Sequence, residues 1–351
     1  MELGVWNLFG IWDLGFGVSP PSSPLCPCAK TMFTTLRNWS EFVKLSHTVF
    51  ALPFALAAMV VAARDNRGWP GWRVFGLILA AMVCARTCAM AFNRIVDRKF
   101  DALNPRTAQR HLPAGKISVA SAWVLWAGSA AGLITASYFL NPLCFYLSPV
   151  ALMVVCFYSL TKRFTDYTHV FLGVALALAP IGAWLAVRGE FGFVPHDTTA
   201  VANTTEQVAR AWAGSIFTGL IPIVLAAAVV FWLIGFDIIY ALQDYEFDRS
   251  HGLRSLVVAW GPLNALRAAF LSHMVTCALL LAFGLLCRFR VAFIVGWIVI
   301  VACLMLEHWI ARRRSLNWVQ NAFFKLNAVV SLAFLGVTVA EVVFQGGFRL
   351  Q

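Results

Sequence analysis

Residues 93–118, NRIVDRKFDALNPRTAQRHLPAGKIS, form a polar and charged segment within a hydrophobic chain. On a helix, Asn93, Asp97 and Asp101 occupy positions i, i+4 and i+8, so their oxygen-bearing side chains share one face. Carboxylates this close together near a membrane are costly unless a cation neutralises them. Amide and carboxylate oxygens suit Mg²⁺, which typically binds one or two carboxylates together with a substrate phosphate. The segment therefore predicts a magnesium site.

A second segment, residues 237–255, DIIYALQDYEFDRSHGLRS, has the same character. Asp237, Tyr240, Asp244 and Asp248 recur at i, i+3, i+7 and i+11, again on one helical face. With Glu246, the two segments hold six of the sixteen acidic residues in the chain. This concentration is not typical of an ordinary solvated surface.

The composition indicates a polytopic membrane protein. Of 351 residues, 60% are hydrophobic and only 12% are charged, and the mean hydropathy is +0.76, which lies outside the range of soluble globular proteins. The net charge of +11 fits cytoplasmic loops and anionic small substrates better than nucleic acid, because so little polar surface is present. We expect a loosely ordered tail over 1–36 and one all-helical membrane domain over 37–351.

Nine apolar runs have about the 17 to 25 residues that a helix needs to cross a bilayer. They lie near residues 45–63, 74–92, 119–140, 143–160, 168–187, 216–236, 268–287, 291–308 and 326–344. With the N-terminus inside, 18 of the 27 basic residues lie on the cytoplasmic side, as the positive-inside rule requires. Four spans separate the two acidic segments, so both emerge on the same face. We expect a multi-pass protein of the inner (cytoplasmic) membrane with its active-site loops in the cytoplasm.

The acids of both segments are interspersed with Arg and Lys, which favours Mg²⁺ bound to a polyphosphate over a bare cation site. The rest of the expected cavity is apolar and aromatic. A diphosphate that carries a long hydrocarbon tail matches all three properties.

These residues carry a family resemblance. Three stretches resemble the first signature of the UbiA family of intramembrane aromatic prenyltransferases: Asn93 to Asp101 (NRIVDRKFD), NPRT at 104–107 and LPAGKIS at 112–118. Asp237 to Asp248 resembles the second signature, and Tyr158 to Lys162 resembles the family's Tyr-x-x-x-Lys diphosphate-binding pair. The resemblance covers about residues 37–345. It implies a nine-span bundle and Mg²⁺-dependent transfer of a polyprenyl group to an aromatic ring.

The resemblance also implies roles for individual residues. Catalytic roles fall to Asp97, Asp101, Asp237, Asp244 and Asp248, and the Mg²⁺ ligands are Asn93, Asp97, Asp101, Asp244 and Asp248. Asp237 either supports the second cluster or positions the acceptor. The substrate-binding residues are Lys44, Arg86, Arg98, Tyr158, Lys162, Arg163 and Tyr240, of which Tyr158, Lys162, Arg98 and Arg163 hold the diphosphate.

Two basic residues are candidates for binding the acceptor. Arg86 lies seven residues before Asn93 on the same helical face, and an intramembrane Arg indicates a functional site; an ion pair with Asp97 or Asp244 and a contact with the acceptor's carboxylate remain equal alternatives. Lys44 opens the first span. His47, His111 and FALPFAL at 50–56 resemble the bacterial 4-hydroxybenzoate branch, including enzymes of the futalosine route to menaquinone. The implied acceptor is 4-hydroxybenzoate or a related hydroxynaphthoate, in ubiquinone or menaquinone biosynthesis.

The acidic segments and the remaining polar residues of the spans also allow other interpretations. A cation-coupled transporter is the competing class, and it predicts acids near the bilayer midplane with broken helices in two repeats. His169, His273 and His308 are interpreted as structural histidines, and Glu307 with His308 as a solvated cluster at a span end. The oligomeric state is left open.

Overall fold

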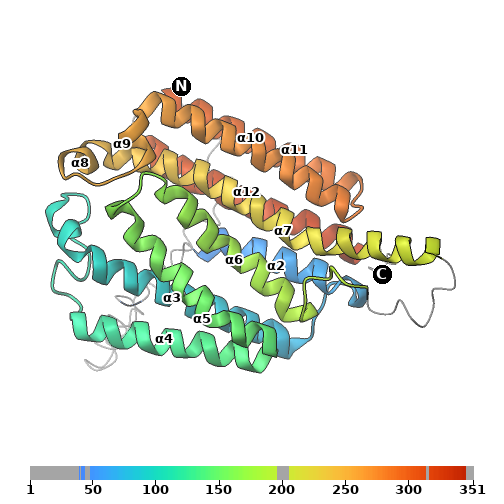
Figure 1. The fold of residues 1–351 in the computed structure, drawn as a ribbon. Helices are drawn as coiled ribbons and strands as arrows, with labels where there is room; N and C mark the ends of the chain where they lie inside the picture. Colours follow the sequence, from blue (N-terminus) through green and yellow to red (C-terminus); the bar gives the residue numbers. More distant parts are fainter. Residues whose placement is uncertain (1–38, 40, 44–47, 196–204, 314–315, 345–351) are drawn as a thin grey trace, which may run out of the picture.

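The computed structural model describes residues 39, 41–43, 48–195, 205–313 and 316–344, in which every long element is a helix (Figure 1). The long helices are α2 (Thr48–Ala62), α3 (Trp72–Leu103), α4 (Val119–Leu140), α5 (Pro142–Phe157), α6 (Thr168–Arg188), α7 (Thr205–Ala241), α10 (Pro262–Leu286), α11 (Val291–Arg313) and α12 (Leu316–Phe344). Short helices η3 (Arg64–Asn66), η4 (Tyr158–Arg163), η5 (Leu242–Asp244), α8 (Tyr245–Ser250) and α9 (Leu256–Trp260) join them. The expected tail at 1–36 lies outside the described residues.

The expected spans correspond to these helices one for one. Eight helices in the described part of the chain are long and apolar enough to cross a membrane, so the chain is a multi-pass integral membrane protein. The ninth expected span, 45–63, corresponds to α2, whose apolar stretch Ala51–Ala62 is shorter than the other eight. At the nine expected spans, the described residues therefore hold eight helices long enough to cross a membrane and one shorter apolar helix.

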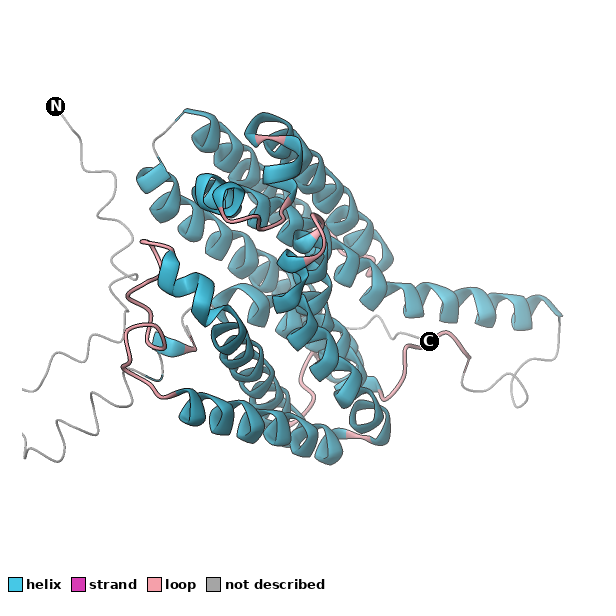
Figure 2. Ribbon diagram, turned by 60° about the vertical axis from the view of Figure 1, so that its left-hand side comes forward, coloured by secondary structure: helices cyan, strands magenta, loops and turns pink. Residues whose placement is uncertain are grey.

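The bundle has two halves that share α6. In one half, α2, α6, α7, α10, α11 and α12 follow one another in contact around a ring. In the other half, α3, α4 and α5 pack together and against α6. Figure 1 shows α3–α5 in the lower part, α10–α12 in the upper part and α6 and α2 between them. The first turns of α7 extend beyond the bundle (Figures 1 and 2).

Large aromatic side chains fill the ring half. Phe54, Trp184, Trp232, Phe283 and Phe334 are almost completely buried in one cluster. Aliphatic side chains on the outside of the bundle remain exposed, as expected for a surface that faces lipid. Close packing inside and apolar side chains outside together fix the orientation of each helix.

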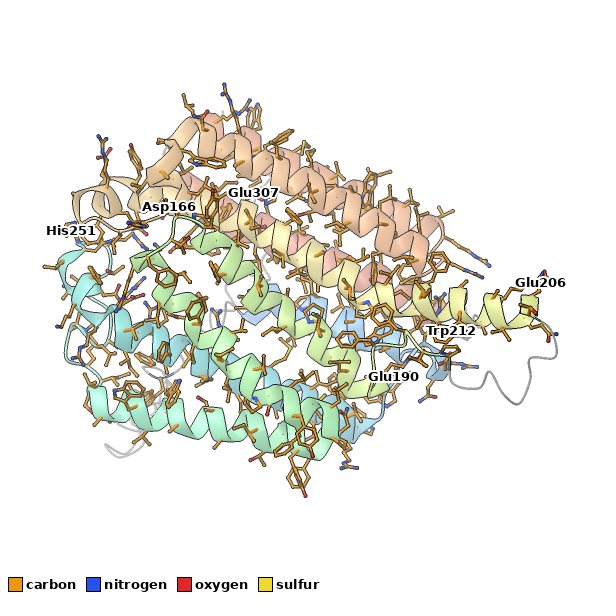
Figure 3. All side chains as sticks on the ribbon, in the orientation of Figure 1. Asp166, Glu190, Glu206, Trp212, His251 and Glu307 are labelled. Carbon is orange, nitrogen blue, oxygen red and sulfur yellow. The ribbon has the colours of Figure 1, made fainter. Side chains whose placement is uncertain are left out.

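A buried polar network links the helices of the ring half. His273 Nδ1 and His308 Nε2 are 2.9 Å apart, and His273 Nε2 is 3.2 Å from the carbonyl oxygen of Trp232. Asn327 Nδ2 donates to Glu307 Oε2 at 3.2 Å. Glu307 and His308 are 2% and 7% exposed, so the prediction of a solvated cluster is wrong; Figure 3 places Glu307 between the upper helices.

Three helices end near one another at the end of the bundle marked by Asp166 and His251 in Figure 3. Helix α3 continues as a helix through the first acidic segment to Leu103. Helix α5 tightens into η4, and α7 continues through η5 into α8. Ser118 then begins α4 by accepting a hydrogen bond from the backbone N–H of Ser121 at 3.0 Å, a standard N-cap. Glu190 and Glu206 mark the opposite end (Figure 3).

Candidate active site

Three segments that are far apart in the sequence line one polar cavity of about 310 Å³. They are the end of α3 with the loop after it, η4 with the start of α6, and the end of α7 with η5 and α8. Its acidic and amide side chains are Asn93, Asp97, Asp101, Asn104, Asp237, Asp244 and Asp248. Its cationic side chains are Arg86, Arg94, Arg106, Arg110, Lys162 and Arg163. The predicted convergence of the two acidic segments is confirmed.

The first acidic segment presents one helical face to the cavity. Asn93 Nδ2 donates to Asp97 Oδ2 at 2.9 Å, as the i, i+4 spacing predicts. Asp97 Oδ1 lies 3.7 Å from Arg163 Nη2. Asp101 is buried, and its Oδ1 accepts a hydrogen bond from Arg110 Nη1 at 2.6 Å. Cations from two different segments therefore balance this pair of carboxylates.

Arg106 joins the first segment to the second. Its Nε and Nη2 donate to the two carboxylate oxygens of Asp244 at 2.9 and 2.6 Å, a bidentate pair of the strong kind. Its Nη1 donates to the Tyr240 hydroxyl at 3.1 Å. Burial opposes the charged form of Arg106, but the hydrogen bonds and electrostatic attraction to Asp244 and Tyr240 together outweigh it, so the pKa of Arg106 is raised. Asn104 Nδ2 donates to Asp244 Oδ1 at 3.4 Å.

The short helix η4 supplies cations to both segments. Lys162 Nζ donates to Asp248 Oδ2 at 3.4 Å. Arg163 Nη2 donates to the Val96 carbonyl oxygen at 2.8 Å, which holds η4 against α3. The backbone N–H of Arg254 donates to the Lys162 carbonyl oxygen at 3.0 Å. These contacts place Lys162 and Arg163 between the two acidic segments.

The donor set of the cavity fits a hard divalent cation. The candidate ligands Asn93, Asp97, Asp101, Asp244 and Asp248 offer only oxygen donors, which Mg²⁺ prefers. Asp101 Oδ2 is buried without a hydrogen bond in the described structure, and Arg94 Nη1 lies 3.8 Å from it. Among the described residues, no three His, Cys, Asp or Glu side chains lie close enough together to form a metal site. The four candidate acids Asp97, Asp101, Asp244 and Asp248 are instead each paired with an Arg or Lys side chain. The metal-binding assignment therefore stays a prediction.

A second, largely apolar cavity of about 410 Å³ adjoins the polar one. Arg86, Tyr158 and Leu176 line both cavities. Arg86 forms no ion pair with Asp97, Asp244 or any other acid among the described residues, and its buried Nε has no hydrogen-bond partner there. The sequence left two roles open for Arg86, an ion pair with Asp97 or Asp244 and a contact with the acceptor. The ion pair is absent from the described structure.

From the sequence alone, His169 is interpreted as a structural histidine and is not connected with Asp237. Its Nδ1 is 2.7 Å from Asp237 Oδ2, and the imidazole is 1% exposed. A lone histidine at the start of a span carries no sequence signal that would distinguish this contact from ordinary packing. Only the packing of α6 against α7 reveals it.

Two predicted substrate-binding residues are not placed in the cavity. Lys44 lies outside the described residues. Arg98 is exposed and is not part of the cavity wall. Arg94, Arg106 and Arg110 line the wall instead. The remaining predicted residues all line the cavity.

Comparison with known proteins identifies the family. The sequence profile described as "UbiA prenyltransferase family" matches residues 51–329. The chain belongs to the UbiA prenyltransferase family. It is 29% identical over 274 residues to a 4-hydroxybenzoate octaprenyltransferase of Pseudomonas aeruginosa, with 78% of this chain and 83% of the relative covered. A 4-hydroxybenzoate octaprenyltransferase of Vibrio parahaemolyticus is 27% identical, with 81% and 89% covered.

Solved structures of UbiA homologues share the fold. The homologue from Aeropyrum pernix, solved in the apo form, has 31% sequence identity and a TM-score of 0.68, with 84% of this chain and 97% of that chain covered. A homologue from Archaeoglobus fulgidus, solved with GPP and Mg²⁺, has 20% identity and a TM-score of 0.60, with 86% and 99% covered. The all-helical UbiA architecture predicted from the sequence is confirmed. The chain is a prenyltransferase, so the transporter alternative is set aside.

Proposed function

We propose that this UbiA-family enzyme transfers a polyprenyl group from a polyprenyl diphosphate to 4-hydroxybenzoate or a related hydroxynaphthoate, with Mg²⁺, in quinone biosynthesis. One observation carries this proposal: two acidic segments and the cations of η4 line a single cavity that adjoins an apolar one. A diphosphate, a hydrocarbon chain and an aromatic acid each find a matching part of this space.

The polar cavity suits the diphosphate. Lysine ammonium and arginine guanidinium groups bind phosphate oxygens in charge-assisted hydrogen bonds. The cavity offers such groups at Arg106, Arg110, Lys162 and Arg163. Asn93, Asp97, Asp101, Asp244 and Asp248 would hold the magnesium. Bound magnesium neutralises the negative charge that develops on the diphosphate as the allylic C–O bond breaks. Around it, Lys162 and Arg163 stabilise the departing diphosphate electrostatically.

The apolar cavity suits the first part of the prenyl chain. It follows α3 from Ala89 to Ile78, which is about 16 Å along a helix axis. An extended isoprene unit is about 5 Å long because it adds four carbon–carbon bonds to the chain. About three units fit in this length, so the rest of a longer chain lies outside it. Leu147 and Val150, which line the cavity, are 39% and 49% exposed on α5 and mark an opening toward lipid.

Arg86 suits the carboxylate of the acceptor. It is a half-buried guanidinium without an acidic partner among the described residues, and it lies where the two cavities meet. An acceptor bound there places its ring beside the allylic carbon, between the diphosphate and the prenyl chain. A bound acceptor and prenyl chain would displace water from this site, which would protect the allylic cation from hydrolysis.

The test is prenyl transfer by the purified protein in detergent or nanodiscs. With Mg²⁺, geranyl diphosphate and 4-hydroxybenzoate, we expect a prenylated acid by mass spectrometry and one diphosphate released per product. EDTA should abolish both signals, and added Mg²⁺ should restore them. Transfer that is indifferent to EDTA would remove the magnesium assignment, and no product with either class of acceptor would overturn the proposed function.

We also propose that the cavity opens to the cytoplasm from the inner membrane. The support is the excess of basic residues at the end of the bundle that carries the site. A cysteine introduced at exposed Lys116, in a variant without its native cysteines, should react with a membrane-impermeant maleimide only in inside-out vesicles. Labelling only in intact cells would reverse the orientation.

A further inference from the structure

Five aspartates line the polar cavity, and one of them differs from the rest in its partner. Four of them lie within ion-pair distance of an Arg or Lys side chain: Asp97, Asp101, Asp244 and Asp248. Asp237 has no such partner among the described residues and instead contacts the imidazole of His169. Among these five carboxylates, Asp237 is therefore the one without a direct contact to an Arg or Lys side chain.

The contact between Asp237 and His169 is short and shielded. The 2.7 Å distance joins Asp237 Oδ2 to His169 Nδ1, so with an ionised Asp237 the Nδ1–H donates. His169 Nε2 is buried and has no hydrogen-bond partner in the described structure. No hydrogen bond to Asp237 Oδ1 is found in the described part of the chain, and Asp237 lines the cavity. One oxygen is thus held while the other stays free to accept a proton.

Asp237 also lies at the depth expected for the acceptor. Asp237 of α7 precedes Asp244 of η5 by seven residues, as Arg86 precedes Asn93 by seven residues on α3. Seven residues of helix correspond to about 10 Å. Arg86 and Asp237 line the same polar cavity. We therefore place the ring of a small aromatic acid beside Asp237 when its carboxylate contacts Arg86.

We propose that Asp237 is the base that removes the ring proton after prenylation, and that His169 is a positioning residue that holds Asp237 for this step. The inference rests on the proposed function. When the allylic C–O bond breaks, the diphosphate leaves with the electron pair, and the ring carbon then bonds to the allylic carbon. The C–H electrons of that ring carbon restore the aromatic ring as its proton moves to Asp237 Oδ1. Asp237 releases the proton to solvent when the product leaves.

A fixed base gives this proton a defined acceptor. The other four cavity aspartates each lie within ion-pair distance of an Arg or Lys side chain and are the candidate magnesium ligands, so a bound ion would occupy their oxygens. A general base acts only within hydrogen-bond reach of the proton that it removes. Other charged or titratable groups that line the cavity with the pair are Lys162 on η4, Arg86 and Asp97 on α3, Tyr240 on α7 and Asp244 on η5. Of these, Lys162 acts on Asp237 electrostatically.

The experiment is a kinetic isotope effect with 4-hydroxybenzoate deuterated at both ring positions next to the hydroxyl. In the wild type, loss of the proton follows a slower bond cleavage, so we expect an isotope effect on kcat near unity. His169→Phe should lower kcat by about 10²-fold, change the KM for the acceptor little, and raise the isotope effect clearly above unity. His169→Gln offers an amide N–H to Asp237 and should recover part of kcat with a smaller isotope effect.

The matched control is His273→Phe. His273 is also a fully buried histidine, but it contacts Trp232 and His308 and does not line the cavity. Its loss should affect stability without an isotope effect. An isotope effect of unity in both His169 variants, measured on protein that remains monodisperse and helical, would overturn the inference alone. A wild type that makes no prenylated product from 4-hydroxybenzoate would count against the proposed function instead.

Discussion

The ion pairs on the cavity wall differ in how well they are shielded. The side chains of Asp97 and Arg163 are 29% and 41% exposed and lie 3.7 Å apart. Asp244 is 11% exposed and forms a bidentate pair with Arg106. Removing one member of a buried pair leaves an uncompensated charge, whereas an exposed pair contributes little to stability. The same chemical substitution therefore has different consequences at the two positions.

Asp97→Ala and Asp244→Ala should each reduce prenyl transfer by about 10²-fold or more, because each removes a candidate magnesium ligand. Only Asp244→Ala should also lower the thermal midpoint in detergent, since Arg106 loses its bidentate partner. Both variants should still insert into the membrane. Turnover close to wild type in either variant would remove that residue from the proposed ligand set.

Lys162→Ala should raise the KM for the prenyl diphosphate by about 10- to 100-fold, the value of one charge-assisted hydrogen bond. The KM for the acceptor should change much less. Arg98→Ala is the matched control, because it removes a cation from the same end of the bundle but outside the cavity. Equal losses of affinity for both substrates in Lys162→Ala would argue against diphosphate binding by Lys162.

Arg86→Leu should selectively impair acceptors that carry a carboxylate. The wild type should use 4-hydroxybenzoate far better than 4-hydroxybenzamide, and the variant should lose most of this preference because the guanidinium no longer pairs with the acid. The ratio of kcat/KM for the two acceptors is the measurement. A ratio that is unchanged in the variant would place the carboxylate elsewhere.

The sequence predicts the helical faces of this site well and its individual partners poorly. The spacing of Asn93 and Asp97 requires a shared face, and the hydrogen bond between them confirms it. The same spacing says nothing about Asp237 and His169, which are 68 residues apart and meet only through helix packing. Local periodicity determines which way a side chain points, while its contacts depend on which helix lies opposite.

At the scale of elements, α11 shows the limit of a hydropathy argument. Glu307 and His308 lie near the end of an apolar run beside Arg312, a position typical of residues at the membrane–water interface. Helix α11 nevertheless turns both inward, where Asn327 of α12 and His273 of α10 provide hydrogen bonds. A buried polar group is tolerated when it has such a partner. The partners come from neighbouring helices and are invisible in the sequence of α11.

Exposed residues of α5 and α6 line the apolar cavity where we propose that it opens to lipid. Gly182 of α6 is exposed and lines this cavity, and a Cβ added there meets no atom within 4 Å. A large side chain at this position therefore narrows the opening without displacing the backbone. Gly182→Trp should lower kcat/KM for an octaprenyl diphosphate while leaving that for geranyl diphosphate close to wild type, because about three isoprene units lie within the cavity itself.

The control for this substitution is Gly128→Trp on α4. A Cβ at Gly128 also meets no atom within 4 Å, but Gly128 does not line the cavity. It should leave the preference for chain length unchanged. If Gly182→Trp uses both diphosphates as the wild type does, the long chain leaves the bundle by another path.

At the scale of the whole molecule, the site lies on the seam between the two halves of the bundle. Helix α3 belongs to one half and α7 to the other, and both contact α6. Hydropathy locates every span, and the expected span 119–140 coincides with α4 (Val119–Leu140), whereas α3 and α7 extend well beyond the expected spans 74–92 and 216–236. The division into halves does not follow from hydropathy, because it depends on side-chain packing such as that of Trp184 and Trp232 in the ring half.

The opening toward lipid that we propose beside Leu147 and Val150 determines how the prenyl donor reaches the enzyme and how the product leaves it. A long prenyl donor and its product both stay dissolved in the bilayer throughout turnover, and neither crosses the aqueous phase. Reaction velocity should then follow the mole fraction of the donor among the lipids of a vesicle. Diluting that vesicle with buffer leaves this surface concentration, and hence the rate per enzyme, unaltered.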